Sequence, residues 1–433
     1  MDFLFIHNER AVRWFAALLM AGAITMIMTI SGCGRVPASA MVALTRSQAT
    51  LTKVRIQLSG DARAVELGDT HILALLQELL RQGQKAESIP DNLAGHRYEI
   101  TFDVSQGNGQ SATYSGYYVR ESDRPGDAGY ITFPEGPYVL PAGFGELVDG
   151  LVTYRPTLTP PKAADDELLQ KYGFAAAFQI ATVALGLPEK LIHHAGQYPT
   201  SLYWAYGNAL SHDIGLSLTP YLGKTVSVRI DKVVELTQPT TNPRNERWVP
   251  DRAIIVSYNG QIVGAWLDRT NDLGRSLKRR ELEAVTGQTW EEWVGTVTDP
   301  NDPVDRRLSA LAPEEVIKAY VTALNTHDYA TLYALFTRHY LLNLILAGRS
   351  ATSLYGPGFD NTDLQKNAGA KLVSVRPETT SPASPAQKEF VVVLDVRTQG
   401  SSAWTNGANT YFFVLRQEIP QNGWRIDGIA TSP

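Results

Sequence analysis

The stretch IIVSYNGQIVGAW, residues 254–266, decides the fold class. Two apolar runs flank Asn259-Gly260, a pair that readily takes the positive φ angles of a two-residue type I′ turn. We therefore expect an antiparallel hairpin here. Apolar and polar residues alternate over 226–230, which predicts a neighbouring strand. Together with the helices expected around it, this sheet indicates an α+β fold.

The hairpin lies in a central α+β module that we place at residues 162–298. A proline-rich linker at 156–161 precedes the module, and the acidic segment 165–167 favours a helix start. A short helix is expected from Pro188. A helix containing the sequence WEEW, residues 290–293, closes the module.

A second α+β module is predicted upstream, at residues 51–155. Alternation over 54–58 predicts a strand, and the apolar positions after Thr70 predict a helix that stops at Gly83. Two further strands are expected at 98–104 and 114–119.

A third module is predicted at residues 308–433. Pro313 suits the first position of a helix, and Asp328 can cap a second helix. Three β-rich runs follow, at 389–397, 409–416 and 424–429. Helices followed by an antiparallel sheet again indicate an α+β order. The chain is therefore expected to contain three small α+β modules.

The third module resembles the nuclear transport factor two-like superfamily. The sequence PEEVIKAYVTALNTHD, residues 313–328, looks like its opening helix, and GWRIDG, residues 423–428, looks like its last strand. The resemblance implies a cone in which a curved, helix-packed antiparallel sheet leaves a pocket at the wide end. Members include isomerases, cyclases and dehydratases as well as domains without known activity, so the fold does not fix the function.

The N-terminus has the layout of a bacterial export signal. Arg10 and Arg13 precede an apolar run over 14–30, and Ile30-Ser31-Gly32-Cys33 resembles the lipobox of bacterial lipoproteins. That resemblance implies lipidation of the Cys33 thiol, cleavage before it, and anchoring at the extracytoplasmic face of the cell membrane. The alternative is an uncleaved anchor helix. We assign residues 1–33 to the signal peptide and lipobox, and 34–50 to a flexible tether.

Composition excludes several classes of protein. The 39 Lys and Arg against 44 Asp and Glu give a net charge of −5 with no basic block, which disfavours nucleic-acid binding. Cys33 is the only cysteine, so an intramolecular disulfide and a cysteine-based metal site are excluded.

The central module is also similar to uncharacterised lipoprotein domains of Gram-positive spore-forming bacteria. The sequence LYWAYGN, residues 202–208, carries this similarity together with 213–216, 221–224, 264–268 and 289–293. The family has no established activity, so the similarity supports location and architecture only. The aromatic residues of 203–206 either stack on a sugar or peptide, or pack inside the protein.

Asp395 is the one candidate catalytic residue. Strand alternation puts it on one side with Val391, Val393 and Arg397. If that side faces the cone, Asp395 is a carboxylate in an apolar pocket, an environment that suits proton transfer. The alternative is an Asp near the strand end at the rim, paired with Arg397 or Arg416.

Metal binding is not expected from the histidines. His193 and His194 are adjacent and should point to opposite sides of an extended segment, and their spacing to His212 and Asp213 matches no recognised zinc motif. No cofactor is expected, and common hydrolase motifs such as Gly-x-Ser-x-Gly and His-Glu-x-x-His do not occur.

These observations predict a lipid-anchored envelope protein that binds a small-molecule ligand or an envelope protein without catalysis. Its expected partners are the membrane, through lipidated Cys33, and that ligand or protein, but no nucleic acid. A small-molecule isomerase or lyase using the C-terminal cone is one alternative. A structural envelope or spore-associated component is another.

Overall fold

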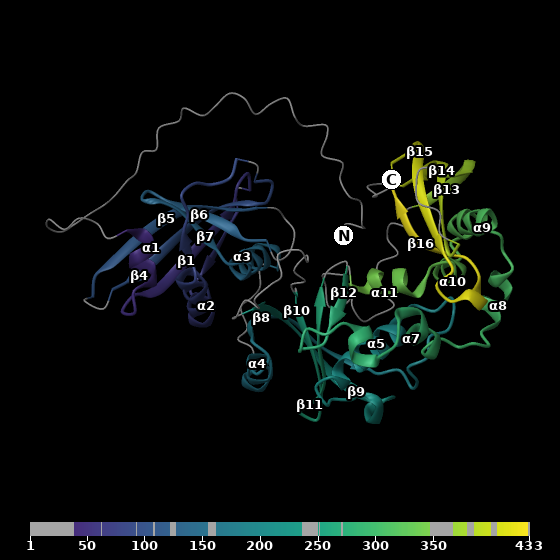
Figure 1. Ribbon diagram of the computed structural model, residues 1–433, viewed down its shortest axis with the longest axis horizontal. Coiled ribbons are helices and arrows are strands. Elements are labelled where there is room, and N and C mark those ends of the chain that lie inside the picture. Colours follow the sequence, from purple (N-terminus) through teal and green to yellow (C-terminus); the bar gives the residue numbers. More distant parts are fainter. Residues whose placement is uncertain are drawn as a thin grey trace.

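The computed structural model describes residues 39–431 except 62, 92, 107–108, 122–126, 155–161, 236–249, 251, 270–271, 347–366, 379–384 and 400–404. Within these residues the chain forms eleven α-helices and three antiparallel sheets (Figure 1), which confirms the α+β class. No helix in the described part of the chain is long and apolar enough to span a membrane. Cys33, the signal segment 1–33 and the linker 156–161 lie outside the described residues.

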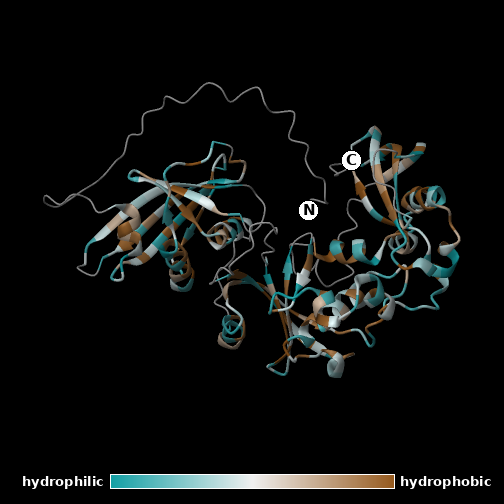
Figure 2. Ribbon diagram, in the orientation of Figure 1, coloured by the Kyte–Doolittle hydropathy of each residue, from teal (hydrophilic) through white to brown (hydrophobic). Residues whose placement is uncertain are grey.

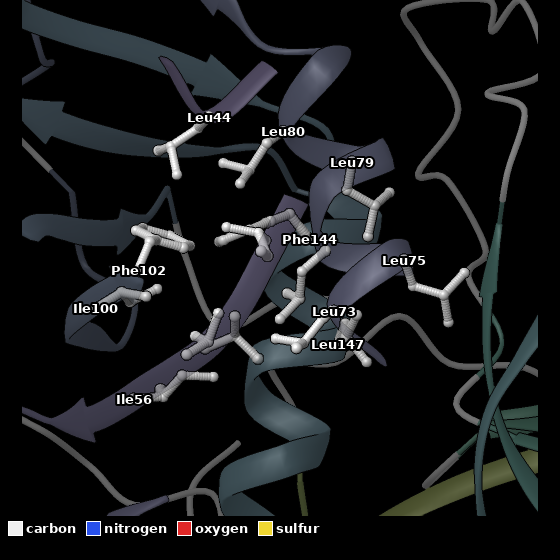
Figure 3. Packing of buried hydrophobic residues seen from close by; sticks show 14 of the residues in the cluster. Leu44, Ile56, Leu73, Leu75, Leu79, Leu80, Ile100, Phe102, Phe144 and Leu147 are labelled. Carbon is white, nitrogen blue, oxygen red and sulfur yellow. The ribbon is translucent and has the colours of Figure 1, made fainter. Parts of the chain in front are cut away.

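The first module is a seven-stranded sheet in the order β2-β1-β4-β5-β6-β7-β3. Figure 3 shows side chains from its three helices meeting Ile56, Ile100 and Phe102 of the sheet. The helices are α1 (Ala40–Thr45), α2 (Thr70–Arg81) and α3 (Ala142–Tyr154), and the strands are β1 (Thr50–Leu58), β2 (Ala64–Leu67), β3 (Gln84–Lys85), β4 (Arg97–Ser105), β5 (Ser111–Arg120), β6 (Gly129–Phe133) and β7 (Gly136–Leu140).

Helix α1 lies in the stretch that we expected to be a flexible tether. That expectation is wrong for residues 40–49, which belong to the first module. Ala40, Met41 and Leu44 are buried in the same core as α2. The Gln77 amide of α2 is also buried and donates to the carbonyl oxygens of Leu44 at 3.0 Å and Ala49 at 2.8 Å. The apolar positions of this short segment cover α2, so it is a folded part of the module.

The second module is built on a five-stranded sheet in the order β12-β11-β10-β9-β8. Tyr258 pairs with Gln261 across the turn, where Asn259 and Gly260 have φ angles of 49° and 82°, so the predicted hairpin is confirmed. The strands are β8 (Phe174–Gly186), β9 (Thr225–Glu235), β10 (Arg252–Tyr258), β11 (Gln261–Arg269) and β12 (Asp272–Arg275).

The helices of this module lie on both sides of the sheet. Between β8 and the next helix, residues 187–199 form no helix, so the helix expected at Pro188 is wrong. The helices are α4 (Ala163–Gln170), α5 (Thr200–His212), α6 (Leu282–Thr286) and α7 (Trp290–Thr296), with α8 (Pro303–Ser309) leading to the third module and a short 3₁₀ turn, η1, at Thr219–Tyr221.

The aromatic residues of 203–206 are core residues of α5. The Tyr203 hydroxyl donates to Asp268 Oδ2 at 2.7 Å, and the Tyr206 hydroxyl donates to the Gly274 carbonyl oxygen at 2.6 Å. Trp204 is buried with its ring centroid 6.1 Å from that of Trp266. The packing interpretation is therefore confirmed over stacking on a ligand.

The third module packs helices against a four-stranded sheet in the order β13-β14-β15-β16. Figure 2 shows hydrophobic residues along its strands, and in the strand Gly407–Arg416 buried and less buried positions alternate, in agreement with one covered face. Asp328 Oδ1 accepts the Thr331 amide at 3.0 Å, which confirms the predicted cap. The elements are α9 (Pro313–Thr326), α10 (Tyr329–Ala334), α11 (Arg338–Leu346), β13 (Asn367–Pro377), β14 (Gln387–Thr398), β15 (Gly407–Arg416), the turn η2 (Pro420–Asn422) and β16 (Arg425–Ala430).

The modules pack against one another through buried contacts. Phe178 of β8 and Val234 of β9 belong to the core of the first module. On the other side, Leu342 and Ile345 of α11 belong to the core of the second module. The Arg252 guanidinium of β10, itself buried, donates to the Leu346 carbonyl oxygen at 2.8 Å.

Candidate functional site: a pocket between α5, α6 and α7

A pocket of about 290 Å³ lies in the second module between α5, α6 and α7. Helix α5 forms its floor and the two shorter helices form its walls, together with residues that precede α5 in the chain. The lining residues are Leu191, Ala205, Asn208, Ala209, His212, Val285, Thr286, Gln288, Trp293, Thr296 and Val297.

The floor of the pocket is one face of α5. Ala205, Asn208, Ala209 and His212 follow the i, i+3, i+4, i+7 spacing that aligns side chains along one side of a helix. The opposite side of α5 packs on the sheet through the aromatic residues described above. The two alanines leave the space that larger side chains would fill.

The polar groups of the pocket are held in place by the protein. Asn208 Oδ1 accepts the Leu218 amide at 2.7 Å, and this bond fixes the orientation of the Asn208 side chain. The Thr286 hydroxyl donates to the Leu282 carbonyl oxygen at 2.8 Å and accepts the Gln288 amide at 3.3 Å, so one lone pair stays able to accept. His212 Nε2 lies 3.2 Å from Ser217 Oγ. Among the described residues that line the pocket, none is Asp, Glu, Lys or Arg.

The α7 wall is fixed at its start and packed within the helix. At its start, Thr289 Oγ1 accepts the Glu292 amide at 3.3 Å while Glu292 Oε2 accepts the Thr289 amide at 2.8 Å, a complete capping box. Within the helix, the rings of Trp290 and Trp293 lie 5.4 Å apart. Trp293, which lines the pocket, is therefore supported by a helix of defined position.

Asp395 does not lie in an apolar interior. Phe390, Val392, Leu394 and Val396 of β14 form the buried side, in the third core. Asp395 is on the other side, half-buried, opposite Lys371 of β13 and Ala408 of β15. The condition for a catalytic Asp395, that its side faces the interior, is therefore not met, because alternation groups residues by face without saying which face is covered.

Aromatic side chains meet between the helices and the last sheet in the described part of this module. The Tyr320 ring of α9 lies 5.5 Å from Phe413 of β15 and 5.9 Å from Phe336. All three side chains are buried in the third core.

The candidate histidines have different surroundings in the structure. His193 is 1% exposed, neither ring nitrogen has a hydrogen-bond partner, and burial lowers its pKa to about 3. His212 lies at the pocket, while Asp213 accepts from the Ser276 hydroxyl at 2.6 Å. His194 instead lies beside two carboxylates that we did not single out from the sequence, those of Asp299 and Asp302.

The pocket itself was not found from the sequence, although one signal was present. The spacing of Ala205, Asn208, Ala209 and His212 marks a small-residue face with polar members. The aromatic residues of 203–206, which are the stronger signal in the sequence, lie on the opposite face of the same helix. Gln288 and Thr296 lie about 80 residues further on, and only folding brings them to this helix.

A comparison with curated proteins gives no match. Two stretches of the chain match models of domain families. Residues 168–267 are similar to a domain of unknown function, DUF4830, and residues 314–430 are similar to a second domain of unknown function, DUF4829. The first stretch includes α5 and the hairpin, the second includes the last sheet, and α6, α7 and α8 lie between them.

Proposed function

We propose that this protein is an extracytoplasmic, lipid-anchored binding protein whose central module holds a small uncharged polar molecule. The observation that carries the proposal is the pocket over α5, in which fixed amide and hydroxyl groups accompany apolar walls. Pockets that combine apolar walls with a few oriented polar groups are typical binding sites.

The lining residues favour a neutral ligand with several hydroxyl groups. Gln288 carries a donor and an acceptor, Asn208 keeps one amide hydrogen beyond its 3.5 Å bond to Thr219 Oγ1, and the threonine hydroxyls add further acceptors. A charged ligand would find no oppositely charged Asp, Glu, Lys or Arg among the described lining residues. At about 290 Å³ the pocket is just smaller than the roughly 300–1,000 Å³ typical of ligand sites, which suits one sugar ring or a comparable polyol.

The membrane anchor in this proposal is supported by the resemblance of residues 30–33 to a lipobox. The helices-then-sheet order of the third module likewise supports a nuclear transport factor two-like domain, here in a structural role. Catalysis in that domain is not proposed, since Asp395 lies outside the apolar interior.

Binding is tested with the purified full-length chain by saturation-transfer NMR against glucose, N-acetylglucosamine and glycerol. Ala209→Leu fills the floor of the pocket, and Ala284→Leu, exposed on α6, is the control. Signal from one of these probes that disappears in Ala209→Leu and persists in Ala284→Leu supports the proposal. No signal from any probe, or equal signal in both variants, contradicts it.

Anchoring is tested separately with Cys33→Ser. The variant is expected to be released from membranes or to remain unprocessed, as shown by fractionation and intact-mass measurement. Unchanged mass together with unchanged membrane retention would contradict lipidation at Cys33.

A further inference from the structure

Three potential metal ligands meet where the segment before α5 contacts the segment before α8. His194 Nδ1 lies 3.3 Å from Asp299 Oδ2 and 3.5 Å from Asp302 Oδ2, and the three ligand atoms lie within 4.8 Å of one another. The Asp302 side chain is only 4% exposed, whereas those of Asp299 and His194 are 28% and 45% exposed. The group is thus anchored on one side and open to solvent on the other.

The protein backbone orients both carboxylates. Asp302 Oδ1 accepts the amides of Val304 at 2.8 Å and Asp305 at 3.2 Å. Asp299 Oδ1 accepts the Asn301 amide at 2.9 Å. In each carboxylate, Oδ1 therefore holds the local backbone, and Oδ2 is the oxygen that faces His194.

Asp302 Oδ2 receives one further bond, from the Ala195 amide at 3.1 Å. A carboxylate oxygen has two lone pairs, so one stays available for a ligand bond. The three side chains come from two separate segments, and the two carboxylates are oriented before any ion binds.

The two separations from His194 Nδ1 agree with those of ligands that share an ion. Ligands at roughly 2.0–2.1 Å from a tetrahedral zinc ion are about 3.3–3.4 Å from each other. The two separations from His194 Nδ1 are 3.3 and 3.5 Å. A direct charge-assisted hydrogen bond would bring nitrogen and oxygen to about 2.7–2.9 Å, and no hydrogen bond joins Nδ1 to either oxygen among the described residues.

We propose that His194, Asp299 and Asp302 form a zinc site with water at the fourth position. An imidazole with two carboxylates suits zinc, whereas calcium requires six to eight oxygen ligands. The exposed side of His194 leaves room for the water. Asp299 and Asp302 lie between the two stretches that match domain families, and His194 lies inside the first of them.

A bound zinc ion would join the segment before α5 to the segment before α8, and both segments also border the pocket. The His193 amide donates to the Val297 carbonyl oxygen at 2.7 Å, and the Asp299 amide donates to the His193 carbonyl oxygen at 3.1 Å. Leu191 and Val297, on either side of this pairing, line the pocket. The zinc site can be tested separately from the proposed function, because zinc binding is measured with no small-molecule ligand present.

The test is a Zn²⁺ titration of the full-length chain by calorimetry, with His194→Ala and Asp299→Asn as variants. Asp302 is left intact because it caps α8. His96→Ala, which removes an exposed histidine of the first module, is the control. Cys33 is present in every variant, so differences between variants report on the His194 group alone.

Removal of either ligand is expected to weaken zinc affinity at least tenfold, while the control keeps the wild-type value. Zinc is also expected to raise the melting temperature of the wild type and the control by more than that of the two variants. Wild-type protein that binds no zinc at 100 µM, or affinity that falls in only one variant or in neither, overturns the proposal.

Discussion

The indole Nε1 of Trp290 donates a hydrogen bond of 2.8 Å to Oε1 of Glu418, 128 residues further along the chain. The same carboxylate accepts the backbone amides of Arg338 at 2.6 Å and His339 at 2.8 Å, at the start of α11. Glu418 is only 2% exposed. One buried carboxylate thus joins the α7 wall of the pocket to the first turn of α11, where a negative charge is favoured by the helix dipole.

Trp290→Phe should destabilise the protein by about 1.5–3 kcal/mol, the usual contribution of a hydrogen bond to a charged group. The phenyl ring keeps the packing of α7 but cannot donate to Glu418. The free energy of unfolding is measured by urea denaturation. Trp424→Phe is the control, because Trp424 is half-buried with Lys388 Nζ 5.0 Å above its ring. Equal losses in both variants would contradict a special role for the Trp290 donor.

Asp305→Asn should be more damaging, at about 3–5 kcal/mol, because it leaves two buried guanidinium groups without a charged partner. Asp305 Oδ1 pairs with Arg425 Nη2 at 3.0 Å and its Oδ2 pairs with Arg338. All three side chains are at most 3% exposed. Burial lowers the pKa of Arg425, and the Asp305 charge acts against that change.

The control for Asp305→Asn is Glu281→Gln. It breaks the pair between Glu281 and Arg275, whose side chains are 61% and 25% exposed, and should cost less than about 1 kcal/mol. The two variants are compared by denaturation under the same conditions. Similar losses in both would mean that burial does not set the energy of the Asp305 network.

His193→Leu should make the protein more resistant to acid. The buried imidazole has a pKa near 3 in the folded chain, whereas an unfolded histidine has its ordinary value of about 6.5. Between these two values only the unfolded chain binds the proton. Above about pH 6.5, His193 therefore does not reduce the free energy of unfolding, and below it that free energy falls by up to about 1.4 kcal/mol per pH unit. Leucine removes this loss.

The measurement is urea denaturation of wild type and His193→Leu at pH 7, 6, 5 and 4.5. The advantage of the variant should grow steadily toward low pH. His96→Leu, at an exposed position, should follow the wild type. A constant difference between His193→Leu and wild type across this range would show that His193 does not titrate as its burial demands.

Two glycine substitutions should have opposite effects. In Gly207→Ala of α5, the new methyl carbon would lie 2.6 Å from atoms of the Trp266 ring, so overpacking of about 1–3 kcal/mol outweighs the gain in helix propensity. In Gly295→Ala of α7, nothing lies within 4 Å, and the higher helix propensity of alanine should stabilise by about 0.5–1 kcal/mol. Thermal unfolding of both variants checks the sign, and stabilisation by Gly207→Ala would show that the α5–sheet contact is loose.

The sequence predicted the elements that are marked by turn or capping residues of their own. Asn259-Gly260 predicted the hairpin turn, Pro313 the start of α9, and Asp328 the cap of α10. Each signal acts through the backbone of its own turn, so distant packing does not alter it. The α+β class followed from these elements.

The elements that the sequence did not reveal depend on packing from outside. Helix α5 is buried at every residue over 202–211, so its sequence lacks the apolar stripe of a surface helix. Helix α11 reads as an apolar run interrupted by Asn343, because it is enclosed between the second and third cores. The face on which Asp395 lies, and the meeting of His194 with Asp299, depend on which elements cover them.

The contact between Glu418 and Trp290 also predicts which segments of the chain recombine together during evolution. It lies in the stretch that matches one domain family, while its indole donor lies outside both matched stretches. A gene fragment encoding residues 314–430 alone would carry a carboxylate that has lost its indole donor and the cover of α7. We therefore expect recombination to move both matched stretches together with the segment between them, as one evolutionary unit.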